Sequence, residues 1–160
     1  MRRPVQELFG DYQNNLYAAA FNVCKNAEDA KDVVQDTFIQ YYSLKKDFDS
    51  EQHIRAWLFR VAINRAKNMN RTFWRRNKKS LEDYMETLVF ETSESEELFE
   101  TVMKLPEKYR IVIHLFYYED YNVNEIADIL KISQSNVKAR LSRGRSLLKE
   151  RLQEEWNDDE

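Results

Sequence analysis

The basic side chains of this sequence are gathered in two blocks on either side of an acidic one. Residues 53–79 contain nine Lys or Arg and no acidic residue, whereas residues 80–100 contain eight acidic residues and no basic one. Residues 131–151 again contain seven basic residues, with Glu150 as the single acid. The net charge of −3 conceals this division. Because two separated basic segments favour two contacts with a polyanion, the pattern indicates nucleic-acid binding at two places.

Residue types that perform catalysis or hold metals are sparse. The one cysteine, Cys24, and the two histidines, His53 and His114, are far apart in the sequence and lack metal-ligand spacing. There is no Gly-rich phosphate loop and no nucleophile paired with a histidine. We therefore expect a protein that is not an enzyme and that has no metal, cofactor or small-molecule ligand. A single cysteine also excludes an internal disulfide framework and fits a reducing compartment.

Helices must position the polar side chains, since the sequence has only two glycines and two prolines. We predict an all-α protein. Periodic apolar residues predict helices over residues 5–23, 26–43 and 54–76, and Asn26 can cap the second of them. The N-terminus has no apolar signal-peptide region, and no apolar stretch of about 18 residues occurs, so we expect a cytoplasmic protein.

The second and third predicted helices each carry a polar stripe opposite an apolar one. On the second helix this stripe is acidic and hydrogen-bonding, and it consists of Asp29, Asp32, Gln35 and Asp36. On the third helix it is basic and amide-bearing, about 20 Å long, and it consists of Arg60, Asn64, Lys67, Asn68, Arg71 and Arg75. Trp57 lies on the apolar stripe of the third helix, so we expect it in the core.

The acidic segment divides the chain into two predicted domains. Residues 77–95 contain Ser and Thr among their acids and show weak periodicity, which is typical of a flexible linker. The linker separates a helical domain over residues 1–76 from a second helical domain over residues 96–155. In the second domain, Asn122 and Glu125 have the spacing of a capping box for a further helix.

The spacing of residues 124–144 predicts a helix-turn-helix. Its predicted buried positions are Ile126, Ala127, Leu130, Ile132, Val137 and Leu141. Lys131 stands at the turn position where Gly is usual, and a left-handed backbone there costs a non-Gly residue roughly 1 kcal/mol. Ser133 can cap the second helix, whose predicted exposed positions are Gln134, Ser135, Asn136, Lys138, Arg140, Arg143 and Arg145. In such a motif the first residues of the second helix reach base edges and later basic residues reach phosphates.

Both halves of the sequence resemble a known family, the extracytoplasmic-function members of the sigma-70 family. Four motifs of the second half resemble region 4 of that family: LPEKYRIVI, FYYEDY, EIADIL and ISQSNVKARLSRGR. Two motifs of the first half resemble region 2: AEDAKDVVQDTF and AWLFRVAIN. The motifs stand in the family's order over about residues 5–152. The resemblance implies a detachable promoter-recognition subunit of bacterial RNA polymerase.

The resemblance implies a role for each polar stripe. The acidic face of the second helix would dock on the clamp helices of the polymerase β′ subunit. On the third helix, Asn64 and Asn68 would contact bases of the promoter −10 element, although many relatives have Asp at position 68. Residues 45–53, before this helix, would capture a flipped base, which costs a few kcal/mol of unstacking. The implied contacts to the DNA backbone are Arg60, Lys67, Arg71, Arg75 and Arg76.

The helix-turn-helix would bind the promoter −35 element. The implied contacts are Ser133, Gln134, Ser135, Asn136, Lys138, Arg140 and Arg143. The linker, with the apolar patch at residues 88–90, would pass through the RNA-exit channel of the polymerase. Further implied partners are the β flap of the polymerase and an anti-sigma factor, which in this family is often membrane-bound.

Two other classes of function remain open on the residues alone. A helix-turn-helix regulator that is not a polymerase subunit would need a sensing domain, and a receiver domain would show βα alternation, whereas residues 1–76 show helices only. An RNA-binding or translation-associated protein would fit the basic third helix. That reading leaves the helix-turn-helix unexplained.

Overall fold

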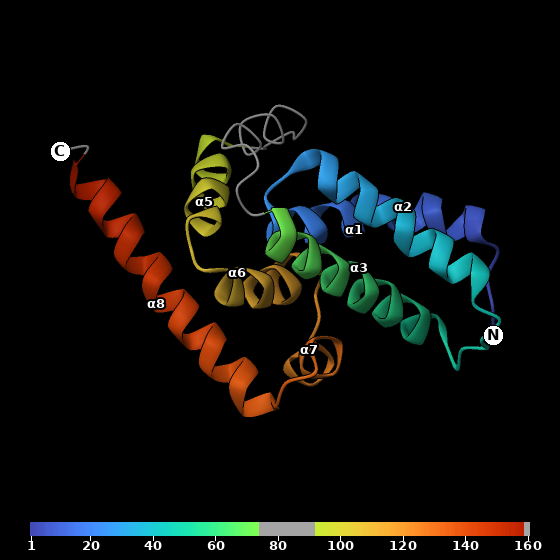
Figure 1. Cartoon of the computed structure of the whole chain (residues 1–160). Coiled ribbons are helices and arrows are strands. Elements are labelled where there is room, and N and C mark those ends of the chain that lie inside the picture. The colour runs from blue at the N-terminus through green and yellow to red at the C-terminus, as the bar shows by residue number, and fades with distance from the viewer. Residues whose placement is uncertain (74–91, 159–160) are drawn as a thin grey trace. The chain divides into compact units, whose positions relative to one another are not determined.

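The computed structural model describes residues 1–73 and 92–158, and every regular element in these residues is a helix. The chain divides into two compact units, Met1–Thr87 and Leu88–Glu160 (Figure 1). The prediction of an all-α protein built from two helical domains is confirmed. None of the described helices has the length and apolar character that crossing a membrane requires.

The first unit is a bundle of three helices, α1 (Val5–Cys24), α2 (Ala27–Ser43) and α3 (Glu51–Phe73). Each helix packs against both others (Figure 1). This packing buries most of the apolar residues on their inner faces. The largest fully buried side chains of this unit are Tyr41, Phe21, Phe48, Phe59, Leu8, Leu16, Ile54, Leu58 and Ile63.

Local hydrogen bonds set the ends of these helices. The side chain of Asn26 accepts a hydrogen bond of 2.9 Å from the amide of Asp29, so the predicted cap of α2 is present. Helix α3 begins at Glu51, earlier than the predicted start at residue 54. Ser50 explains the difference, because its carbonyl and its hydroxyl accept hydrogen bonds from the amides of Ile54 and His53.

Aromatic rings join the loop before α3 to the core. Phe48, in this loop, is buried and stacks on Tyr41 with ring centroids 5.8 Å apart. Trp57 packs edge-on against both rings, at 6.1 Å from Tyr41 and 6.0 Å from Phe48. The expected packing of Trp57 is present, although the side chain stays half-buried.

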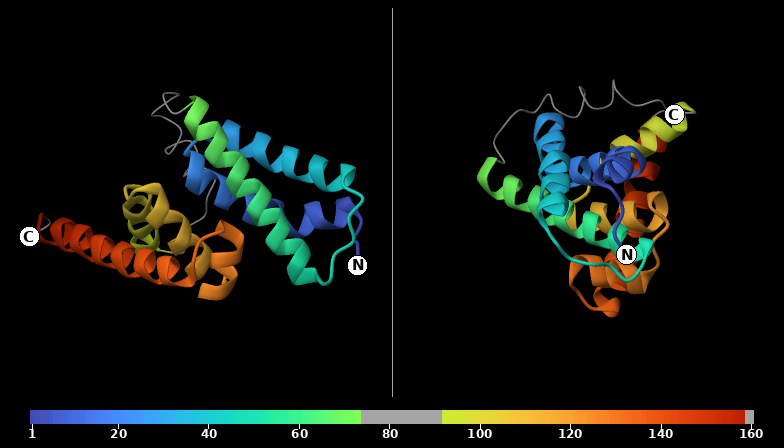
Figure 2. Two further views of the ribbon diagram at one scale, coloured as in Figure 1. Left: turned by 60° about the horizontal axis from the view of Figure 1, so that its bottom comes forward. Right: turned by 90° about the vertical axis from the view of Figure 1, so that its right-hand side faces the viewer.

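The second unit contains α5 (Ser93–Met103), α6 (Glu107–Ile113), a π-helical turn η1 (His114–Tyr118), α7 (Val123–Leu130) and α8 (Gln134–Asp158). Helices α5, α6 and α7 all pack against the long α8 (Figure 2). At Gly144, α6 and α8 cross so closely that a side chain would press on α6. A Cβ atom there would lie 2.9 Å from Cδ1 of Ile113.

Helix α5 begins inside the segment that the sequence predicts as a linker. Thr92 caps it, with a hydrogen bond of 3.0 Å from the amide of Ser95 to the Thr92 hydroxyl. Glu94 and Glu96 lie in the first turn, where the helix dipole favours negative charge. The remainder of the predicted linker before Thr92, including the apolar patch at residues 88–90, lies outside the described residues.

Candidate nucleic-acid interface

The helix-turn-helix predicted over residues 124–144 is formed by α7, a short turn and the first half of α8. The capping box is present: the amide of Glu125 donates to Oδ1 of Asn122 at 2.8 Å, and the amide of Asn122 donates to Oε1 of Glu125 at 3.0 Å. Lys131 adopts the expected left-handed conformation, with φ 57° and ψ 45°. Its amide and the amide of Ile132 both donate to the carbonyl of Ala127, which closes the turn.

The packing of these helices leaves one face of α8 in solvent. Val137 and Leu141 are buried and hold α8 against the rest of the unit. Five of the predicted −35 residues are exposed, namely Ser133, Gln134, Ser135, Lys138 and Arg143. The two others, Asn136 and Arg140, are half-buried. These seven residues of α8 and its N-cap are called the −35 surface below, after the predicted role.

Two hydrogen bonds organise this surface. Nε of Arg140 donates to Oδ1 of Asn136 at 3.1 Å, one helical turn away. Nε2 of Gln134 donates to Oδ1 of Asn124 at 3.1 Å, which joins α8 to α7. Asn124 was not among the predicted site residues. Its place at the start of α7 is visible in the sequence, but its approach to Gln134 depends on how the two helices cross.

Arg145, which the sequence also predicts to be exposed on this helix, is exposed in the structure. Its Nε donates to the hydroxyl of Tyr117 at 2.6 Å. Its guanidinium also lies 5.5 Å from the ring centroids of Phe116 and Tyr117. The aromatic residues of η1 thus contact Arg145, an arrangement that the sequence does not predict.

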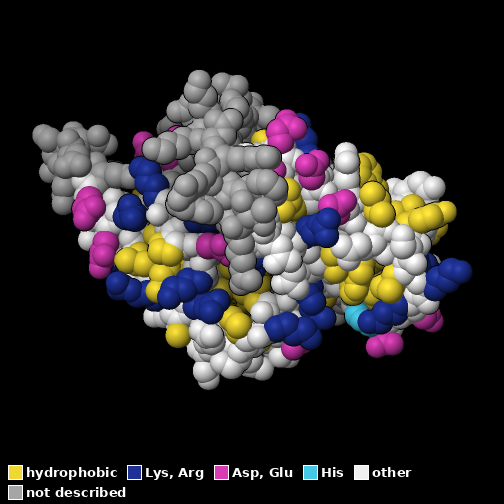
Figure 3. Space-filling model, in the orientation of Figure 1, with side chains coloured by type: hydrophobic (Ala, Val, Ile, Leu, Met, Phe, Trp, Pro, Cys, Tyr) yellow, Lys and Arg dark blue, Asp and Glu magenta, His cyan; other side chains and the backbone are white. Residues whose placement is uncertain are grey.

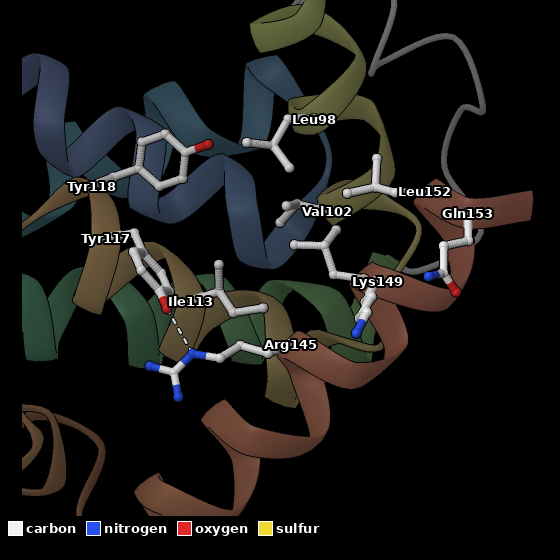
Figure 4. Close-up of a pocket in the computed structure, with 10 residues that line it drawn as sticks. Leu98, Val102, Ile113, Tyr117, Tyr118, Arg145, Lys149, Leu152 and Gln153 are labelled. Carbon is white, nitrogen blue, oxygen red and sulfur yellow. Dashed lines mark hydrogen bonds between the residues drawn. The ribbon is translucent and has the colours of Figure 1, made fainter. Parts of the chain in front are cut away.

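A groove lies beside Arg145, between α5, the end of α6, η1 and the second half of α8 (Figure 4). Its volume is about 910 Å³, and its lining residues are Leu98, Val102, Ile113, Tyr117, Tyr118, Arg145, Leu148, Lys149, Leu152 and Gln153. Figure 3 shows hydrophobic surface between α5 and α8 with Lys and Arg side chains beside it. Partial burial raises the pKa of the Tyr118 hydroxyl above its ordinary value.

The predicted −10 residues on α3 differ in exposure. Asn64 and Asn68 are exposed, whereas Arg60 and Lys67 are half-buried. Arg71 lies in α3, but its side chain is not described. The remaining two predicted residues, Arg75 and Arg76, lie outside the described residues.

On α2 the structure divides the predicted acidic face. Asp32 and Gln35 are exposed, and Asp36 is partly exposed and accepts a hydrogen bond of 2.8 Å from Nη2 of Arg65 on α3. Asp29 is buried, with 8% of its surface exposed, which corrects the expectation that it belongs to the exposed face. The reason is helical spacing, because Asp29 lies in one row with Val33, which packs in the core.

Two apolar residues extend the exposed face of α2 and were not predicted. Ile39 is 61% exposed and Tyr42 is 74% exposed. With Asp32 and Gln35 they are spaced three or four residues apart, so they form one stripe along the helix. The sequence carried a signal for them, since both residues fall outside the apolar stripe that faces the core.

Comparison with known proteins gives matches in both units. The family model for sigma-70 region 2 matches residues 8–80, and that for sigma-70 region 4 matches residues 95–148. The ECF RNA polymerase sigma factor SigW of Bacillus subtilis is 28% identical over 176 residues, which cover 93% of this chain and 91% of SigW. The ECF RNA polymerase sigma-E factor of Salmonella typhimurium (strain 14028s) is 32% identical over 142 residues, covering 78% of this chain and 74% of the relative.

A solved structure is similar over most of the chain. CnrH, in complex with the cytosolic domain of CnrY, has a TM-score of 0.69 and 29% sequence identity, over 93% of this chain and 87% of CnrH. The match to region 2, the match to region 4 and the identity to sigma-E all agree with the order of the motifs in the sequence. The chain belongs to the extracytoplasmic-function sigma factors of the sigma-70 family, which are initiation subunits of RNA polymerase.

Proposed function

We propose that the two units bind the two promoter elements and that α2 docks on core RNA polymerase. The observation that carries this proposal is the −35 surface. A capped helix presents small polar side chains at its N-terminal end and the basic residues Lys138 and Arg143 farther along. This is the distribution that major-groove recognition needs, because base edges accept and donate hydrogen bonds while phosphates attract cations.

The first unit binds the −10 element through α3 and the loop before it. Asn64 and Asn68 are exposed one helical turn apart, so their amides can pair with bases along one strand. Arg60 and Lys67 lie near them on the helix and supply positive charge for the DNA backbone. Arg71, Arg75 and Arg76 are proposed to continue this backbone contact.

The exposed stripe of α2 is the proposed polymerase-binding surface. Asp32 and Gln35 offer negative charge and hydrogen bonding, and Ile39 and Tyr42 offer apolar area next to them. A basic, partly apolar partner such as the β′ clamp helices would complement both parts of this stripe. Asp36 contributes less to it than predicted, because its carboxylate is paired with Arg65.

The groove of the second unit is the proposed docking site for the β flap of the polymerase. Its apolar lining suits the apolar face of an amphipathic helix, and Arg145 and Lys149 at its edge suit acidic residues flanking that face. We also propose an anti-sigma partner, since the similar CnrH was solved with the cytosolic domain of CnrY. The protein would act in the cytoplasm and catalyse no reaction of its own.

In vitro transcription tests the function. The purified chain is mixed with bacterial core RNA polymerase and fragmented genomic DNA of the source organism, and the run-off transcripts are sequenced. We expect new start sites that share two upstream motifs. The test variant is Asp32→Arg combined with Gln35→Arg, and the control is Glu100→Arg, an exposed charge reversal on α5.

The outcomes separate the proposed function from its rival. Loss of the new transcripts in the α2 variant but not in the control supports polymerase docking through α2. Absence of new transcripts with the unmodified chain, together with sequence-specific duplex binding by the free chain, would contradict the proposal. That result would instead favour a helix-turn-helix regulator that is not a polymerase subunit.

A further inference from the structure

The first three residues of the chain run alongside the loop that joins α2 to α3 (Figure 2). The amide of Phe48, in this loop, donates to the carbonyl of Met1 at 2.9 Å. The hydroxyl of Tyr41, near the end of α2, accepts from the amide of Arg3 at 3.1 Å and donates to its carbonyl at 2.8 Å. Backbone groups of Met1 and Arg3 are therefore tied to both ends of the loop.

The side chain of Arg2 bridges α2 and the loop. Nη2 donates to the carbonyl of Tyr41 at 2.6 Å, and Nη1 donates to the carbonyl of Lys46 at 3.1 Å. The same guanidinium lies over the ring of Tyr41, 4.5 Å from its centroid. A planar guanidinium can span two carbonyls in this way, whereas a lysine ammonium cannot hold the same geometry.

The side chain of Arg3 joins α1 to the start of α3, where the loop ends. Nη1 donates to Oε1 of Glu51, the first residue of α3, at 2.5 Å, and Nη2 donates to Oδ2 of Asp11 at 2.6 Å. The hydroxyl of Tyr12 donates to the same Glu51 oxygen at 2.7 Å. Burial, and secondly this hydrogen bond, raises the pKa of Tyr12 to about 12, so it stays a donor at neutral pH.

The other side of the loop is fixed by Phe48. Its ring is buried among Tyr41, His53 and Trp57, at centroid distances of 5.8, 5.0 and 6.0 Å. The loop is thus held from inside by one aromatic ring and from outside by residues 1–3. The loop residues Lys45, Lys46 and Asp49 are exposed.

We propose that residues 1–3 form a strap that holds this loop in the shape needed to capture a base of the −10 element. The inference rests on the proposed −10 function of the first unit. Ordering a loop during binding costs conformational entropy for each side chain that becomes immobilised. A loop that is already held by the strap avoids this cost, so Arg2 and Arg3 are positioning residues for base capture.

Hydrogen exchange tests the strap itself. Two variants remove hydrogen bonds of the strap. Arg2→Ala removes the bridge to Lys46, and Tyr41→Phe removes the hydroxyl that binds Arg3. Lys31→Ala is the control, an exposed cation of α2. We expect faster exchange in the peptide that covers residues 44–50 in both strap variants, with unchanged protection in α1 and in the control.

DNA binding tests the consequence for base capture. After run-off sequencing has defined the −10 motif, the complex of the chain with core polymerase is titrated with a single-stranded −10 oligonucleotide. A second oligonucleotide lacks the captured base. Because stacking and hydrogen bonding of the captured base favour binding, we expect the unmodified chain to prefer the intact oligonucleotide by about 10-fold. In the strap variants this preference should fall to about 2-fold or less.

The two measurements distinguish the strap from the function on which it rests. Equal affinity of the unmodified chain for both oligonucleotides would contradict base capture by this loop. An unchanged 10-fold preference in both strap variants would overturn the strap proposal alone. Equal weakening of both oligonucleotides, together with a lower melting temperature, would mean that residues 1–3 only stabilise the unit, which would also overturn the proposal.

Discussion

At the N-terminal end of α8, two side chains of the proposed −35 surface are hydrogen-bonded to each other. Asn136 uses its oxygen to accept from Arg140, which leaves its NH2 group as a donor toward bases. Arg143 does not take part in this hydrogen bond, and it is exposed farther along α8. From position on the helix we propose base recognition for Asn136 and phosphate binding for Arg143.

Substitution of these two residues should have different effects on promoter choice. Asn136→Ala should relax sequence preference in the −35 element, with a loss of about 1–3 kcal/mol on the best site. Arg143→Ala should weaken all sites about equally and reduce the slope of log K against log salt by about 0.9. Binding of randomised duplexes at several salt concentrations measures both effects, and equal losses on every sequence for both variants would contradict the division.

At the scale of the element, backbone conformation and helix contacts decide which residue type suits a position. Lys131 has a left-handed backbone conformation, which is sterically unfavourable for a residue with a Cβ atom. The two glycines lie inside helices and have opposite surroundings. A Cβ atom at Gly10 would meet nothing within 4 Å, whereas one at Gly144 would press on Ile113. Helix propensity therefore favours alanine at both positions, whereas packing opposes it only at Gly144.

Lys131→Gly should stabilise the second unit. Glycine adopts the left-handed turn without the steric cost of a Cβ atom, so we expect a gain of about 0.5–1 kcal/mol in the free energy of unfolding. Ala139→Gly, at an exposed position inside α8, is the matched control and should lose about 1 kcal/mol. Urea denaturation measures both, and a destabilised Lys131→Gly variant would show that the lysine side chain contributes more than its turn costs.

Gly10→Ala should stabilise the first unit by about 0.5–1 kcal/mol, because alanine loses less backbone entropy in a helix and the site has free space. Gly144→Ala has the same gain in helix propensity but must move the Ile113 side chain, so its net gain should be smaller or absent. Thermal denaturation of the two variants compares them directly. An equal gain at both positions would contradict the close crossing of α6 and α8.

At the scale of the whole molecule, promoter-specific initiation requires both units to work on one polymerase. The −35 surface lies at the N-terminal end of α8, and the groove is lined by its second half, at Arg145, Leu148 and Leu152. We therefore propose that different parts of this one helix bind DNA and the β flap. The two contacts should be separable by substitution.

Leu152→Glu should place a charge in the groove and block the flap. We expect at least a 10-fold loss of transcription from a promoter that depends on its −35 element, with unchanged binding of the free chain to −35 duplex DNA. Ser146→Glu, an exposed position of α8 outside the groove lining, is the control. Unchanged transcription by the Leu152→Glu variant would contradict flap docking in this groove.

The sequence by itself determined the helical class, the caps at Asn26 and Asn122, the left-handed Lys131 and the exposed face of the recognition helix. These features depend on residues three or four positions apart, whose relation is set by the geometry of a single helix. The family motifs are likewise runs of consecutive residues, so they can be identified in the sequence.

The tertiary structure alone decided the features that join distant residues. It buried Asp29, paired Asp36 with Arg65, turned Arg145 toward Tyr117 and laid residues 1–3 along the loop before α3. Periodicity identifies which face of a helix is apolar, but it does not state which other helix covers that face or where a covered face ends. Contacts between side chains far apart in the sequence follow from that packing, and only the folded chain shows them.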